Sequence, residues 1–275
     1  MKNINASLEV SPKHVFDNKQ LNGLLPQETD IYIADIGTDS TEDIVKAAKI
    51  LNEYGYCPVP HLAARRLSSS EMLSDRVERL AKEANVKNAL VIAGDIHKAL
   101  GPYEDSLSLL QTEIFDRLNF NTIAIAGHPE GSPNFTKEQA LDALKQKQIY
   151  AQNSDIEFHI VTQFGFDMES FIAWSEAVKS ENIDFPIHLG VAGPAKIATL
   201  IRFAALCGVG NSLAFLKKRG SAVANLATGY NPNSLVEKLE NYLDNNPESN
   251  ISQIHVFPFG GIEKTAQWLK SRGSL

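Results

Sequence analysis

The chain has few cysteines, no excess of basic residues and no long apolar run. Its two cysteines, Cys57 and Cys207, are too few for a disulfide framework or a zinc motif, and we expect both to be buried thiols in a reducing compartment. Acidic residues outnumber basic ones by 33 to 26, which argues against nucleic acid as a partner. No apolar stretch reaches the roughly 20 residues that cross a bilayer. The first fourteen residues contain no apolar run between Lys2 and a small-residue cleavage site, so we expect no signal peptide and a cytoplasmic location.

What the sequence does contain is a regular alternation of short apolar runs with longer amphipathic segments. The apolar runs are Ala6–Val10, Ile31–Ile36, Pro58–Ala63, Ala89–Ala93, Thr122–Ala126, Phe158–Phe164, Pro186–Val191 and Gln253–Pro258. Runs of this kind are typical of parallel strands buried on both faces. Eight strand–helix repeats in 275 residues predict a single-domain α/β protein, 1–275, with a (β/α)8 TIM-barrel fold.

The segments between these runs have helical spacing. Ser40 is expected to cap a helix that Gly55 ends, and further helices are expected over Ser68–Val86, Tyr103–Leu118, Thr136–Ala151 and Asp167–Ser180. A doubly wound sheet is the alternative fold, but the turn after the first run lacks the glycine often found there. The stretch 194–246 is too long for one helix and breaks at Gly208–Gly210, Gly220 and Gly229–Pro232, which predicts extra short helices between strands seven and eight.

Active sites of such barrels lie at the carboxyl ends of the strands, so the polar residues there are the candidates. They are Glu9, Asp35, His61, Asp95, His128, Glu130, Gln163 and His188. Glu9 lies inside the first run. A carboxyl group facing a barrel interior has a raised pKa and suits a general acid. The alternative is an exposed glutamate on an alternating strand.

Two further candidates follow strands three and four. Gly94 lets a flat ligand approach the backbone, and Asp95 can accept hydrogen bonds from ring N–H groups, although a Gly-Asp pair is also a common turn. His61 follows two prolines that hold the chain extended, and Arg65 and Arg66 after it favour a nearby anion site. A structural role for this histidine is equally open.

The segment 162–167, Thr-Gln-Phe-Gly-Phe-Asp, places the Gln163 amide beside the rings of Phe164 and Phe166. This combination suits a planar heterocycle. Core aromatics followed by a helix cap at Asp167 are the simpler interpretation, and both can hold. The stiff loop 127–133, Gly-His-Pro-Glu-Gly-Ser-Pro, is either part of the site or only a turn.

Taken in order, five segments resemble the methylenetetrahydrofolate reductase family. They are Ser-Leu-Glu-Val-Ser-Pro, Pro-His-Leu-Ala-Ala-Arg, Ala-Gly-Asp, His-Pro-Glu-Gly-Ser-Pro and Thr-Gln-Phe-Gly-Phe-Asp, within a resemblance from Glu9 to about Trp268. The resemblance implies reduction of methylenetetrahydrofolate in an FAD-containing barrel, where NADH or NADPH reduces the flavin and the flavin passes a hydride to the folate.

The resemblance also implies roles for individual residues. Glu9 matches the catalytic general acid, Asp95 an aspartate near flavin and pterin, and Gln163 a pterin-contacting glutamine with Phe164 beside it. Residues at or near flavin-lining positions are His61, Ala93, Gly94, Asp95, Tyr103, His128 and Lys147. No metal ligand is implied, and tetrahydrofolate is the expected small-molecule partner.

Several positions depart from the family pattern, and they gather at flavin contacts. Leu-Arg-Gly-Asp becomes Ile92–Asp95 without the arginine, a threonine becomes Asp35 or shifts to Thr38, and His128 and Ser132 replace a tyrosine and a histidine. The smaller, divergent branch of the family, marked by His-Leu-Ala-Ala-Arg, is the most similar. Direct hydride transfer from NAD(P)H without flavin therefore stays open.

The same barrel fold also serves other functions. A Schiff-base aldolase needs a strand lysine, and none of the eight runs has one. A metal hydrolase would have to gather His61, His128 and Asp95. A folate-binding barrel without reductase activity and a folate-dependent methyl transferase remain alternatives. The choice between NADH and NADPH, and between a monomer and a homo-oligomer, is not determined by the sequence.

Overall fold

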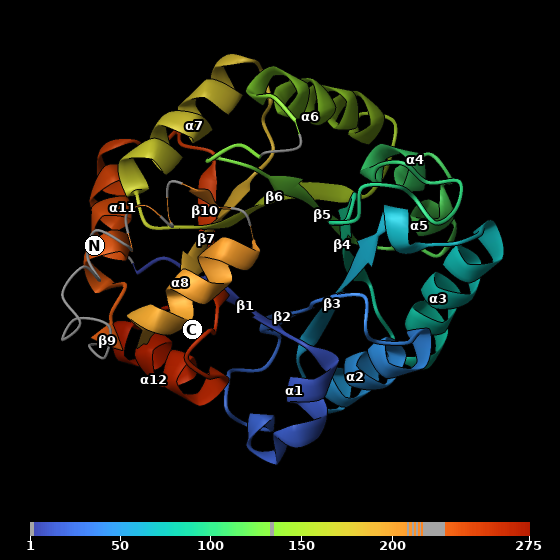
Figure 1. Cartoon of the computed structure of the whole chain (residues 1–275), viewed down its shortest axis with the longest axis horizontal. Helices are drawn as coiled ribbons and strands as arrows, with labels where there is room; N and C mark the ends of the chain where they lie inside the picture. The colour runs from blue at the N-terminus through green and yellow to red at the C-terminus, as the bar shows by residue number, and fades with distance from the viewer. Residues whose placement is uncertain are drawn as a thin grey trace. The chain divides into compact units, whose positions relative to one another are not determined.

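The protein is a closed barrel of eight strands, in the order β1-β10-β7-β6-β5-β4-β3-β2 (Figure 1). The computed structural model describes residues 3–132, 135–207, 209, 210, 212, 214, 216 and 229–275. The strands are β1 (Ala6–Val10), β2 (Asp30–Ile33), β3 (Cys57–Ala63), β4 (Asn88–Ile92), β5 (Thr122–Gly127), β6 (Glu157–Gly165), β7 (Ile187–Ala192) and β10 (Ile251–Phe257). The registered pairs β1–β10, β10–β7, β2–β3, β3–β4 and β4–β5 are parallel. This confirms the predicted TIM-barrel fold.

Helices follow the strands along the chain. They are α1 (Pro12–Asp17), α2 (Thr41–Glu53), α3 (Ser70–Glu83), α4 (Ser106–Leu110), α5 (Ile114–Arg117), α6 (Lys137–Ala151), α7 (Met168–Ser180), α8 (Ile197–Leu206), α11 (Asn233–Asn245) and α12 (Ile262–Arg272), with 3-10 turns at Lys19–Leu21 and Ala64–Arg66. Ser40 caps α2 in a capping box with Asp43, as expected. Among the described residues, no helix combines the length and apolar character needed to span a bilayer.

Two sequence-based boundaries were wrong. The strand expected over Ile31–Ile36 ends at Ile33, and Ile36 is 58% exposed, because the Asp35 side chain accepts a hydrogen bond from the Gly37 N–H and turns the chain. The helix expected over Tyr103–Leu118 is two short helices, α4 and α5. The break lies at Glu113, whose φ of 55° is left-handed and cannot continue a helix.

The extra helices expected between the seventh and eighth barrel strands are partly present. α8 and α11 lie there, and they are accompanied by an unforeseen two-stranded antiparallel sheet of β8 (Ala195–Lys196) and β9 (Gly229–Tyr230). Gly208, Gly220 and the stretch 217–228 lie outside the described residues.

The residues group into two compact units. Unit 1 comprises Met1–Leu8, Gly127–Asp142 and Val161–Leu275, and unit 2 comprises Glu9–Ala126 and Ala143–Ile160. Unit 1 has an apolar core that includes Phe164 and Leu200. In unit 2, α2 packs against α3 and β3 (Figure 1). Ile31 and Leu62 of the same unit are fully buried. That the chain forms one domain over 1–275 stays a prediction.

Candidate functional site

In unit 2, Glu9 on β1 faces His61 on β3. The His61 Nε2 lies 3.3 Å from the Glu9 Oε2, and the two side chains are 9% and 21% exposed. The distance suits an ion pair when the ring is protonated, although the angle is not that of a hydrogen bond. Acid–base contacts are commonly loose before substrate binds and tighten afterwards. Both residues are candidates from the sequence, but their proximity is visible only in the structure.

Behind His61 lies a buried pair that the sequence analysis missed. The Tyr32 hydroxyl on β2 is 2.8 Å from the Nε2 of His159 on β6, and the Tyr32 and His61 rings meet edge to face with centroids 6.2 Å apart. Burial, with the charges of Asp30 and Glu9, raises the pKa of Tyr32 well above its usual value. The available signal was a ring with a polar atom inside each of the runs Ile31–Ile36 and Phe158–Phe164.

The loop after β4 carries Gly94 and Asp95. Gly94 has a φ of +94°, a conformation that favours glycine. The Asp95 carboxylate, 76% exposed, pairs with the Arg66 guanidinium at 2.5 Å. Arg65 donates to the carbonyl groups of Glu104 and Ile96, and its own N–H donates to the Ala93 carbonyl. The two arginines therefore hold this loop, and the anion site expected near them stays a prediction.

Asp35, a strand-end candidate, has a structural partner. Its carboxylate lies 2.9 Å from the Arg76 guanidinium on α3, with the side chains 3% and 4% exposed. Arg76 also donates to the Thr41 hydroxyl. This buried pair ties the loop after β2 to α3.

Lys147 on α6 is, like Arg76, a buried cation of unit 2. Lys147 is only 7% exposed. Burial lowers the pKa of its ammonium group to about 8, and the charge of Asp105 partly opposes this shift. Tyr103, also 7% exposed, has its pKa raised by burial. A buried ammonium is costly, and an anionic ligand group would relieve that cost.

Replacing Lys147 with methionine should stabilise the protein at neutral pH. Between pH 8 and 10.5 the folded protein releases this proton while the unfolded chain keeps it, so wild-type stability should rise by up to about 3 kcal/mol across that window. Lys147→Met removes this pH dependence. The difference in the free energy of unfolding between Lys147→Met and wild type should therefore be largest at pH 7 and shrink as the pH approaches 10.5. Denaturant unfolding of both proteins at pH 7, 9 and 10.5 measures it. A constant gap would show that Lys147 is charged in the folded state throughout.

In unit 1, Gln163 and Phe164 line a cavity of about 100 Å³ at the carboxyl end of β6. The Gln163 Oε1 accepts a hydrogen bond from the Phe164 N–H at 3.0 Å. β7 approaches β6 closely here: a Cβ on Gly190 would lie 2.5 Å from the carbonyl oxygens of Thr162 and Gln163. Glycine at this position therefore sets where the Gln163 backbone lies.

The loop after β5 supplies the opposite wall. His128 and Glu130 line the same cavity, and the Glu130 carboxylate is held by the backbone N–H of Ser212 at 3.0 Å and by its hydroxyl. His128 packs edge to face on Phe135, with centroids 4.8 Å apart. The cavity thus combines an amide, a carboxylate and aromatic surface, as a polar heterocycle requires.

Three cavity residues were missed: Phe171, Cys207 and Val209. The ring of Phe171 occupies the space beside Gly165, where a Cβ would lie 2.2 Å from it. The prediction that both cysteines are buried was wrong, because Cys207 is exposed and Cys57 only partly buried. Cys207 follows the last residue of α8 and lines the cavity, so it does not belong to the buried core.

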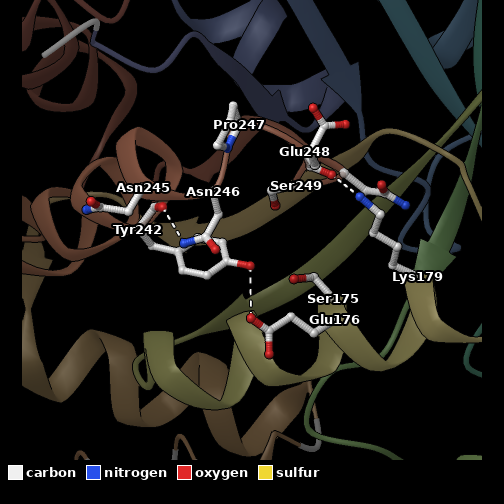
Figure 2. Close-up of a pocket in the computed structure, with 10 residues that line it drawn as sticks. Ser175, Glu176, Lys179, Tyr242, Asn245, Asn246, Pro247, Glu248 and Ser249 are labelled. Carbon is white, nitrogen blue, oxygen red and sulfur yellow. Dashed lines mark hydrogen bonds between the residues drawn. The ribbon is translucent and has the colours of Figure 1, made fainter.

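A second, larger groove of about 380 Å³ lies in unit 1 between α7 and the α11–β10 connection (Figure 2). The Tyr242 hydroxyl donates to Glu176 at 3.0 Å, and Lys179 donates to the Glu248 carbonyl. This groove lies at the amino ends of β7 and β10, and its lining includes none of the predicted site residues. Catalytic residues of TIM barrels come from the carboxyl ends of the strands. We therefore favour the smaller cavity, at the carboxyl end of β6, as the candidate functional site.

Of the predicted site residues, the structure brings together Glu9 with His61 in unit 2, and Gln163, Phe164 and His128 in unit 1. Asp95 is directed to Arg66. Convergence of Glu9, Asp95 and Gln163 on one ligand stays a prediction. Within the described part of the chain, no three histidine, cysteine or acidic side chains group as a metal site would.

Known proteins resemble this chain in sequence and in fold. The sequence profile of the family described as methylenetetrahydrofolate reductase matches residues 17–257, so Glu9 precedes the matched segment. Methylenetetrahydrofolate reductase 1 of Schizosaccharomyces pombe is 30% identical over 159 residues, which cover 54% of this chain and 25% of that protein. The 5,10-methylenetetrahydrofolate reductase of Escherichia coli is 27% identical over 217 residues, which cover 75% of this chain and 70% of that protein.

Among solved structures, dihydropteroate synthase from Thermus thermophilus superimposes with a TM-score of 0.50 at 9% identity, covering 99% of this chain and 93% of that one. This likeness supports the barrel fold alone. The profile match extends over most of the sequence and over both compact units. The chain therefore belongs to the methylenetetrahydrofolate reductase family.

Proposed function

We propose that the protein is an enzyme that reduces 5,10-methylenetetrahydrofolate to 5-methyltetrahydrofolate, with hydride from NADH or NADPH relayed through FAD. Family membership supports the reaction class. The observation that carries the proposal is the Glu9 carboxyl group on the first barrel strand, mostly shielded from water and 3.3 Å from His61. The same proposal makes it a cytoplasmic enzyme of one-carbon metabolism.

The chemistry requires a proton and a hydride. Glu9 donates its proton to one nitrogen of the five-membered ring, the carbon–nitrogen bond breaks, and the bridging carbon becomes an iminium. Hydride addition to that carbon completes the methyl group. A carboxylate left beside the developing cation stabilises it electrostatically.

We assign the binding and orientation of the folate to Gln163, Phe164 and Asp95. The Gln163 amide can both donate to and accept from the edge of a pterin ring, and Phe164 supplies apolar surface beside it. Asp95, at the loop after β4, is the second carboxylate that we assign to the pterin. Holding the iminium carbon against the hydride donor is worth up to several kcal/mol.

The residues present fit a dinucleotide cofactor. Lys147 is a buried cation that a pyrophosphate would neutralise, and we place the flat ring of the cofactor against the backbone at Gly94, after β4. We assign His61, Ala93, Gly94, Asp95, Tyr103, His128 and Lys147 to this group. When bound, FAD would supply the hydride that NADH or NADPH provides.

A second route is favoured by one feature. Ala93 stands where the family carries an arginine beside the flavin, and both neighbouring arginines are engaged with the protein itself. Direct hydride transfer from NADH or NADPH to the iminium needs no flavin, and the same Glu9 would serve it.

The test is an assay of the purified protein with NADH or NADPH and methylenetetrahydrofolate, combined with its visible spectrum. Oxidation of the nicotinamide with formation of methyltetrahydrofolate supports the proposal. Flavin absorbance then identifies the FAD route, and a colourless active protein the direct route. Folate binding without turnover, or methyl transfer that needs no nicotinamide, would overturn it.

A further inference from the structure

A line of four polar side chains crosses the interior of unit 2, from Glu9 through His61 and Tyr32 to His159. We propose that the buried Tyr32–His159 pair positions His61 against Glu9, and that His61 returns to Glu9 the proton that Glu9 gives to the substrate. This inference rests on the proposed function and assigns His61 to the proton path of that reaction, with Tyr32 and His159 as positioning residues.

The far end of the line is fixed. Tyr32 is fully buried and His159 is 9% exposed, and their oxygen and nitrogen atoms are 2.8 Å apart. The raised pKa of Tyr32 keeps its proton on the oxygen, and we assign the phenol as the donor and the Nε2 of His159 as the acceptor. This assignment makes His159 the neutral tautomer with its proton on Nδ1.

The hydrogen-bonded Tyr32 in turn holds His61 in place. A phenol tethered at its hydroxyl cannot rotate freely, so its ring presents a fixed edge-to-face surface to His61. His61, 7% exposed, is thereby kept in an orientation that directs its Nε2 toward Glu9. Each of the four residues comes from a different strand, β1, β3, β2 and β6, so the arrangement is rigid.

The proton balance follows. When Glu9 protonates the ring nitrogen, its O–H bond breaks and an N–H bond forms on the folate. The Nε2–H of a protonated His61 then transfers to the Glu9 carboxylate, and His61 regains from solvent hydronium the one proton that the overall reduction consumes. Imidazole is suited to this return step, because it exchanges protons near neutral pH. The charged groups acting on Tyr32 are Asp30 and Glu9.

The experiment compares Tyr32→Phe with Tyr56→Phe. The Tyr56 hydroxyl is equally buried in unit 2, donating to the Leu21 carbonyl at 2.6 Å and accepting from the Leu25 N–H at 3.2 Å, so its loss controls for general destabilisation. Tyr32→Phe should lower kcat by about ten- to a hundredfold with KM little changed, since a small misplacement of a catalytic group costs this much. Tyr56→Phe should leave both close to wild type. Equal kcat values in the two variants would overturn the proposal.

Nitrogen-15 NMR of the histidine rings gives a readout that needs no turnover. Wild-type His159 should show an unprotonated Nε2, and Tyr32→Phe should shift the ring signals of both His159 and His61, whereas Tyr56→Phe should shift neither. A protonated Nε2 on wild-type His159 would overturn the proposal even if Tyr32→Phe fails to fold. If the wild-type protein lacks reductase activity, the proposed function fails, while the NMR result still decides whether Tyr32 holds His61.

Discussion

Glu9→Gln is expected to lower kcat for methylenetetrahydrofolate reduction by about 100- to 10,000-fold, the usual contribution of a positioned general acid. Glutamine keeps the size and hydrogen-bonding capacity of the side chain but cannot release a proton to the ring nitrogen. Folate affinity should stay close to wild type, because the lost interaction belongs to the transition state. Steady-state kinetics and folate titration by fluorescence measure the two effects.

The matched control is Glu176→Gln, in the groove at the amino ends of β7 and β10 (Figure 2). It removes the same charge and leaves the Tyr242 hydroxyl an oxygen acceptor, so turnover should be unchanged. Unchanged turnover in Glu9→Gln would remove Glu9 from the mechanism. Loss of turnover in Glu176→Gln instead would move the active site to the groove.

Arg76→Leu should destabilise the protein by about 3–5 kcal/mol, the typical cost of leaving one partner of a buried ion pair alone. The Asp35 carboxylate, whose side chain is 3% exposed, would lose the guanidinium 2.9 Å away and keep only the Gly37 N–H. The double variant Asp35→Leu/Arg76→Leu should recover most of the loss, because no buried charge then remains. Urea unfolding of the single and double variants gives these differences.

The control for this prediction lies on the same helix. Lys82→Leu breaks the exposed Glu78–Lys82 pair of α3, whose lysine side chain is 67% exposed, and should cost at most about 1 kcal/mol. If Arg76→Leu costs no more than Lys82→Leu, the Asp35–Arg76 pair contributes little. Asp35 would then return to the candidates for ligand binding.

Periodicity predicted most of the fold correctly because it depends on local physics. β1 has the predicted bounds, Ala6–Val10, and α2 begins after the predicted cap at Ser40. The errors arose where a backbone conformation decided the outcome. The apolar pattern of the sequence indicates neither the left-handed conformation of Glu113 nor the turn made by the Asp35 side chain.

The sequence alone determined which residue types are available at the strand ends: an acid on the first strand, a histidine on the third, and an amide beside aromatic rings on the sixth. It determined the barrel too, since apolar runs of strand length alternating with amphipathic helices have few other ways to bury their surfaces. Only the tertiary structure decided which of these groups have partners. Asp35 pairs with Arg76, Asp95 with Arg66, and Tyr32 with His159 across 127 positions of sequence. Such pairs form because buried charges and hydroxyls must be satisfied by whatever the packing brings near, and the packing is a property of the whole chain.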